Sequence, residues 1–110
     1  MSFEVKSLPR FDREIKRLAK RYPSLKEDFG ALLNAIGENP FGGISLGNQC
    51  FKVRMPITYK NKGKSGGARV IYYIRIVNTT IYLLAIFDKS EKDNLPEKEL
   101  RQLIKTIGQQ

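Results

Sequence analysis

The 110-residue chain contains no histidine, no tryptophan and a single cysteine, Cys50. The lack of histidine excludes catalytic triads of the Ser-His-Asp kind, imidazole metal ligands and histidine acid–base pairs. One cysteine excludes an internal disulfide and a cysteine-based zinc site. The longest apolar run, Ile81–Phe87, has seven residues, whereas a membrane-spanning helix needs about 20. We therefore predict a protein with no membrane segment, no metal and no cofactor.

The first residues also lack an apolar core of signal-peptide length, so we expect a cytoplasmic protein. The length fits one domain, spanning residues 1–110. Hydrophobic residues make up 41% of the chain and charged residues 28%. Because aliphatic and aromatic residues recur in every segment, the composition is that of a folded globular protein rather than a disordered one.

Acidic residues are missing from the middle of the chain. The net charge is +9, from 20 Lys and Arg against 11 Asp and Glu. Residues 1–38 carry a net charge of +2 and residues 88–110 a net charge of 0, so residues 39–87 carry the remaining +7. The basic residues of this acid-free stretch are Lys52, Arg54, Lys60, Lys62, Lys64, Arg69 and Arg75. A block of one sign is typical of a phosphate-binding face, although an acidic protein or an anionic lipid also fits it.

The first half of the chain predicts a strand and a helical hairpin. Residues 3–6 alternate between apolar and charged, as in a half-buried strand. Apolar residues then recur at helical spacing over 11–22 and again over 25–36. The pattern Ser24-Leu25-Lys26-Glu27 is typical of a capping box at the start of the second helix. Residues 41–47 are interpreted as a loop.

The second half predicts three strands and a last helix. The strands are expected over 50–55, 68–76 and 81–87, and the helix over 95–107. The strand 81–87 is apolar on both faces, which is typical of a central strand covered on both sides. The fold class is therefore α+β in the order β-α-α-β-β-β-α, a small antiparallel-rich sheet with a helical hairpin packed on one face.

Strand periodicity places several cations on common faces. Lys52 and Arg54 share one face of their strand, and Arg69, Tyr73 and Arg75 share one face of theirs. If these two strands are neighbours, Arg69 lies near Lys52 and Arg54. A guanidinium group binds a phosphate in a bidentate way, which a lysine does not. The plainer alternative is that Lys and Arg occupy solvent-facing strand positions and protect the sheet from aggregation.

A glycine-rich basic segment joins these two strands. Residues 60–69 hold three glycines among three lysines and an arginine, which allows the backbone to approach a ligand closely. Gly63-Lys64-Ser65 is not a P-loop, because that motif requires a glycine where this chain has Thr58. The alternative is a flexible hairpin loop with solubilising lysines. The mixed charges of residues 88–93 are, taken alone, typical of a turn before a helix.

Three segments together resemble the RelE/ParE toxin superfamily: Phe51–Arg54 (FKVR), Lys62–Tyr73 (KGKSGGARVIYY) and Tyr82–Leu95 (YLLAIFDKSEKDNL). The long Gly-Lys-x-Gly-Gly-x-Arg loop is similar to that of the HigB-like branch. Residues 16–23 (KRLAKRYP) are similar to the end of the family's first helix. The resemblance covers nearly the whole chain, and it rests on the order and spacing of the segments rather than on one motif.

The resemblance implies a compact sheet with two helices on one side and a concave basic face on the other. It also implies a toxin of a type II toxin–antitoxin system that cleaves messenger RNA on the ribosome and so inhibits translation. A cognate antitoxin would block the toxin, and operator DNA would be bound only through their complex. The matching site residues are the paired strand cations Lys52 and Arg54, the phosphate-binding Arg69, and the C-terminal basic residues Lys89 and Lys92.

Two positions depart from the RelE branch, which has arginine in place of Ser90 and a base-stacking tyrosine in place of Pro96. Tyr73 is the candidate substitute for that tyrosine. Further RNA contacts are expected from Lys60, Lys62, Lys64 and Arg75.

RNA supplies its own nucleophile, the 2′-hydroxyl, so the chemistry needs positioning, charge stabilisation and proton transfer. With no histidine, the base has to be a lysine or a carboxylate. We predict Lys52 as the base and Lys89 or Lys92 as the acid, with Glu91 as the competing base.

Two other functions are also compatible with the sequence. A ParE-like toxin would poison DNA gyrase by protein binding, without any need for a phosphate-cleaving cluster. A non-catalytic module for single-stranded RNA would need exposed aromatic residues among the cations, and Tyr59, Tyr72 and Tyr73 are available.

Overall fold

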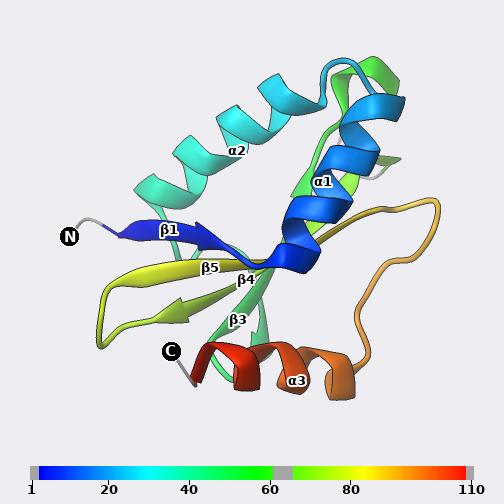
Figure 1. The fold of residues 1–110 in the computed structure, drawn as a ribbon. Coiled ribbons are helices and arrows are strands. Elements are labelled where there is room, and N and C mark those ends of the chain that lie inside the picture. Colours follow the sequence, from blue (N-terminus) through cyan, green and yellow to red (C-terminus); the bar gives the residue numbers. More distant parts are fainter. Residues whose placement is uncertain (1–2, 61–65, 109–110) are drawn as a thin grey trace.

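The computed structural model describes residues 3–60 and 66–108. A five-stranded sheet carries α1 and α2 on one face and α3 on the other (Figure 1). The elements are β1 (Glu4–Ser7), α1 (Pro9–Arg21), α2 (Leu25–Glu38), β2 (Ile44–Gly47), β3 (Cys50–Met55), the 3-10 helix η1 (Thr58–Lys60), β4 (Ala68–Arg75), β5 (Thr80–Asp88) and α3 (Glu97–Gly108). The strand order is β1-β5-β4-β3-β2. Among the strands described, only β1 and β5 pair in parallel, so the α+β class and the antiparallel-rich sheet are confirmed.

The sheet has a hydrophobic core on each face. On the first face, Phe11 and Leu18 of α1 pack with Tyr72 and Ile86 of the sheet. On the second face, α3 contributes Leu100, Leu103, Ile104 and Ile107 to a cluster that includes Ile71, Tyr73, Leu84 and Phe87. All nine residues of β5 are buried, as predicted for a central strand. The second face is therefore partly covered by α3, as the apolar character of both faces of this strand predicts, whereas the resemblance implied a concave basic face there.

The segment predicted as a loop over 41–47 contains the edge strand β2. Asn48 and Gln49 join β2 to β3, and both have positive φ, at 53° and 64°. This is the conformation of a tight two-residue hairpin turn. The prediction was wrong because the pair Asn-Gln lacks the glycine that usually marks such a turn, and because a short edge strand has little apolar periodicity.

Ser24 does not act in a capping box, since its side chain accepts no hydrogen bond from a backbone N–H at the start of α2. Instead its hydroxyl donates to Asp28 at 2.9 Å and accepts from the Tyr59 backbone N–H at 2.9 Å. Asp28 in turn accepts from the backbone N–H and the hydroxyl of Thr58, at 2.9 and 2.6 Å. These bonds fasten η1, which precedes the glycine-rich segment, to the first turn of α2. None of the helices described is long and apolar enough to cross a membrane.

Candidate nucleic-acid interface

The pairing of β3 with β4 places Arg54 directly opposite Arg69. Because side chains alternate along a strand, Lys52 lies on the same face as Arg54, two residues away. Arg54 is exposed, and Lys52 is partly exposed. Like charges facing each other across a ladder are destabilising. The pairing of two arginines therefore creates a local field that favours an anion on this face.

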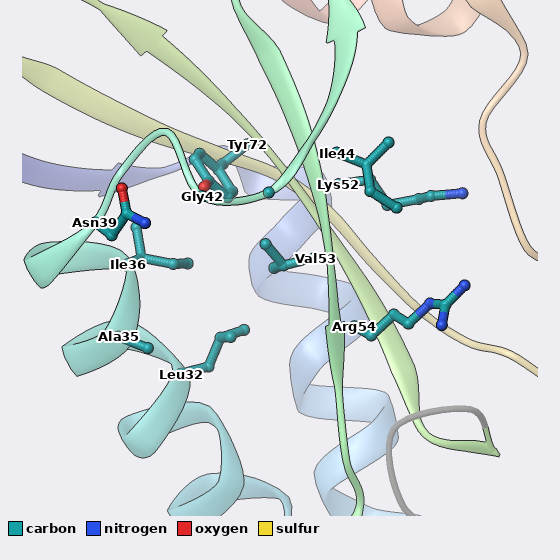
Figure 2. Close-up of a pocket in the computed structure, with 11 residues that line it drawn as sticks. Leu32, Ala35, Ile36, Asn39, Gly42, Ile44, Lys52, Val53, Arg54 and Tyr72 are labelled. Carbon is teal, nitrogen blue, oxygen red and sulfur yellow. The ribbon is translucent and has the colours of Figure 1, made fainter.

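The two sides of β3 differ in chemistry. Figure 2 shows Lys52 and Arg54 extending to one side of the strand, whereas Val53 extends to the other, towards α2. On the α2 side lies a groove of about 560 Å³, with apolar walls that include Leu32 and Ile36. Lys52 and Arg54 also line this groove, so the groove borders the cationic face.

Arg69 and Lys52 meet at Asp93. The Arg69 side chain is only 3% exposed, and its Nε lies 3.1 Å from Asp93 Oδ1. Its Nη1 donates to the Ala68 carbonyl at 3.2 Å, and Lys52 Nζ donates to the Asp93 carbonyl at 3.2 Å. Desolvation alone would raise the pKa of Asp93, but the attraction of Lys52, Lys89 and Arg69 outweighs it and lowers this pKa. Asp93 therefore marks the point where these cations converge.

Lys89 and Lys92 follow β5 at the same end of the sheet as Arg69. The Lys89 backbone N–H donates to the Gly67 carbonyl at 2.9 Å. Lys92 Nζ lies 5.2 Å from the centre of the Phe87 ring, and Phe87 is the strand partner of Arg69. The structure thus brings together the five residues predicted as catalytic: Lys52, Arg54, Arg69, Lys89 and Lys92.

Asp88 fixes the turn that carries these two lysines. Its carboxylate is fully buried and accepts from Lys60 Nζ at 2.8 Å, from the Ser90 N–H at 3.0 Å and from the Tyr22 hydroxyl. Its carbonyl accepts from the backbone N–H groups of Glu91 and Lys92, at 2.9 and 3.2 Å. Burial acts to raise the pKa of Asp88, but the hydrogen bonds from Lys60, Tyr22 and Ser90 hold it well below its usual range.

Three of the residues predicted to bind RNA, Lys60, Tyr73 and Arg75, lie apart from this cluster. Lys60 is bonded to buried Asp88 and lies 5.3 Å from the centre of the Tyr22 ring. Tyr73 and Arg75 are four and six residues beyond Arg69 on β4, which corresponds to about 13 and about 20 Å along a strand. Tyr73 is buried in the second core, and Arg75 lines a hollow with Arg101 and Lys105. Lys62 and Lys64 lie outside the described residues.

Two acidic residues have contacts in the structure that differ from the roles predicted for them from the sequence. Glu91, the competing base, is bonded to Arg17 of α1 at 3.0 Å. Asp93, which had been interpreted as part of a turn, is the acid bonded to Arg69. A partner separated from Arg69 by 24 residues leaves no mark in strand or helix periodicity. The available signal was that Asp93 directly follows Lys92, in a segment already expected beside Arg69.

Comparisons with known proteins give a family and a fold. The sequence model of a family described as "RelE toxin of RelE / RelB toxin-antitoxin system" matches residues 11–110. The free Escherichia coli toxin RelE, in a double-mutant form, superposes with a TM-score of 0.65 at 15% identity, covering 97% of this chain and 99% of that one. A chain of the intact E. coli RelBE toxin–antitoxin complex gives a TM-score of 0.62 at 16% identity, covering 79% of this chain and 96% of that one. A chain of the toxin–antitoxin complex RelBE2 from Mycobacterium tuberculosis gives a TM-score of 0.57 at 16% identity, covering 80% of this chain and 99% of that one.

Proposed function

Because this chain belongs to the RelE toxin family, we propose that it inhibits translation by cutting messenger RNA on the ribosome. The observation that carries the proposal is the pairing of Arg54 with Arg69 across β3 and β4, with Lys52 on the same face. A single-stranded RNA backbone brings one negative charge per nucleotide to such a face. Contact with phosphate relieves the repulsion between the two arginines and at the same time positions the scissile bond.

The proposed chemistry uses the 2′-hydroxyl of the RNA as the nucleophile, so the protein's part is charge stabilisation and proton transfer. Arg54 and Arg69 would stabilise the negative charge that develops on the phosphorane. Lys52 would accept the proton of the 2′-hydroxyl, and Lys89 or Lys92 would donate one to the leaving oxygen. We prefer Lys52 to Glu91 as the base, because the Glu91 carboxylate is bonded to Arg17 of α1.

The track of the message beyond the cleavage point is a second part of the proposal. Arg75, Arg101 and Lys105 line a hollow on the face covered by α3. These cations would contact phosphates several nucleotides away from Arg69. Tyr73 is 9% exposed and stacking needs an open ring face, so we leave it out of the base-binding group.

We also propose that a cognate antitoxin neutralises the toxin. The solved E. coli and M. tuberculosis relatives are toxin–antitoxin complexes. This chain carries a net charge of +9, so an acidic, amphipathic antitoxin segment would complement the Lys52 and Arg54 face. Co-purification with the product of the adjacent reading frame would support this pairing. The absence of any complex between the two purified proteins would contradict it.

Arg54→Ala is the sharpest test of the cleavage function, because Arg54 is exposed and its loss should leave the fold intact. On ribosomes programmed with a defined message, we expect single-turnover cleavage to fall about 100- to 1000-fold, as for loss of one charge-stabilising donor. Lys26→Ala, which removes an equal charge from α2 on the opposite side of the sheet, is the matched control and should cleave normally. Equal cleavage by Arg54→Ala and Lys26→Ala would refute the proposal.

The same preparation separates the other two functions. A gyrase poison would leave the message intact and would inhibit supercoiling by purified gyrase. A binding module would retain RNA in a filter or anisotropy assay without shortening it.

A further inference from the structure

Arg69, the residue best suited to bind a phosphate, is covered in this conformation. Its side chain is 3% exposed, whereas the Asp93 side chain bonded to it is 55% exposed. Asp93 therefore lies on the solvent side of the pair. A phosphate arriving from solvent meets the position of the Asp93 carboxylate before it reaches Arg69.

Asp93 also binds Lys52, a second cation of the site. Its carboxylate accepts a hydrogen bond from Arg69 Nε at 3.1 Å, and its backbone carbonyl accepts one from Lys52 Nζ at 3.2 Å. A single residue thus supplies acceptor oxygens to Lys52 and Arg69, both of which the cleavage reaction would require. The chemistry is that of a phosphate stand-in, namely an anionic group with further acceptor oxygen beside it.

The segment around Asp93 is built so that this residue can move by itself. Before it, the turn 89–92 is fixed by the hydrogen bonds of Asp88 to Ser90, Glu91 and Lys92. After it, Leu95 is buried in the second core. Only Asp93 and Asn94 lie between these two anchors, and both are exposed. A rotation confined to these two residues opens the Asp93 contacts to Arg69 and Lys52 without unfolding the turn or α3.

We propose that Asp93 is a resident ligand of Lys52 and Arg69, which a phosphate of the RNA substrate has to displace. This inference rests on the proposed function, because it presumes that these two cations bind RNA. It deepens that function by assigning Asp93 a role in substrate affinity: RNA binding includes the opening of the Asp93 contacts. A phosphate can take the place of the Asp93 carboxylate, because arginine forms charge-assisted and frequently bidentate bonds with both groups.

The test compares Asp93→Asn with wild type. The probe is an RNA oligonucleotide whose riboses are 2′-O-methylated, so that it binds but is not cleaved. We expect Asp93→Asn to bind this probe about three- to tenfold more tightly, since one competing anion is gone. In single-turnover cleavage of unmodified RNA, the concentration that gives half-saturation should fall to the same extent, while the cleavage rate at saturation changes less than about twofold.

Glu27→Gln is the matched control. It removes the same charge from the first turn of α2, on the opposite face of the sheet, where Glu27 is exposed. Its affinity for the probe should stay within about twofold of wild type, which separates displacement at Arg69 from a general change in net charge. Asp93→Ser removes the carboxylate with a smaller side chain and should repeat the effect of Asp93→Asn.

Three results would overturn the inference in distinguishable ways. If both Asp93 variants bound the probe no more tightly than wild type, while wild type still bound and cleaved RNA, the proposed displacement of Asp93 would be refuted and the proposed function would stand. Loss of the saturated rate with unchanged affinity would make Asp93 the general base instead. Wild type that neither binds nor cleaves RNA would refute the proposed function and this inference with it.

Discussion

Replacing Lys60 with methionine should destabilise the protein strongly, because it leaves the Asp88 carboxylate buried without its cation. The Asp88 side chain is 0% exposed and that of Lys60 is 15% exposed, and the two are 2.8 Å apart. Removing one partner of a buried ion pair costs about 3–5 kcal/mol. Tyr22 and the Ser90 N–H still donate to Asp88, so we expect the lower end, about 3 kcal/mol. For a domain of this size that corresponds to a fall in melting temperature of roughly 10–15 °C.

Thermal and urea unfolding of Lys60→Met, Asp88→Asn and the double variant give the required comparison. The double variant should lose about 1–2 kcal/mol less than the sum of the single ones, since it no longer buries a lone charge. Arg17→Met is the control, because it breaks the half-exposed pair with Glu91 and should cost less than about 1 kcal/mol. If Lys60→Met cost no more than Arg17→Met, the reasoning about the buried pair would be wrong.

Three further predictions concern acid stability, the glycine before β4 and the thiol. The folded-state pKa of Asp88 is lowered. The ionised carboxylate therefore stabilises the fold above its unfolded-state pKa of about 3.9, and this stabilisation is lost as the pH falls through the folded-state pKa. In acid unfolding series, the difference in unfolding free energy between wild type and Asp88→Asn should narrow below about pH 4. A Cβ at Gly67 would lie 2.0 Å from the Met55 carbonyl oxygen, whereas one at Gly30 meets nothing within 4 Å. Gly67→Ala should therefore cost about 1–3 kcal/mol in urea unfolding, while Gly30→Ala in α2 should gain about 0.5–1 kcal/mol. Burial raises the pKa of Cys50 to about 12, so a thiol reagent at pH 8 should label it only at the rate of unfolding, and rapid labelling of the folded protein would contradict that.

The sequence predicted most of the fold, because most elements carry a clear hydrophobic period. The alternation over 50–55 and the apolar run over 81–87 correspond to β3 and β5, and both long helices of the hairpin lie where expected. The edge strand β2 was missed, since four residues ending in glycine have too few side chains to show alternation. The position of α3 was missed for another reason: periodicity shows that a helix has an apolar face but not which surface that face covers.

The candidate site could be predicted as a set of cations but not as a set of contacts. Alternation alone placed Lys52 and Arg54 on one face, and the register of β3 with β4 then set Arg54 opposite Arg69. The acids could not be assigned in this way. Glu91 and Asp93 are two residues apart, yet one is bonded to Arg17 and the other to Arg69. Long-range ion pairs depend on how the elements pack, which no local pattern encodes.

We propose that the face formed by Lys52, Arg54 and Arg69 cleaves RNA by means of the RNA's own 2′-hydroxyl. The most direct measurement uses ribosomes programmed with a message that carries one 2′-deoxynucleotide at the position cut in the unmodified message. We predict that wild-type protein truncates the unmodified message there and leaves the 2′-deoxy message at full length. Cleavage of both messages at that position, or of neither, would contradict the account.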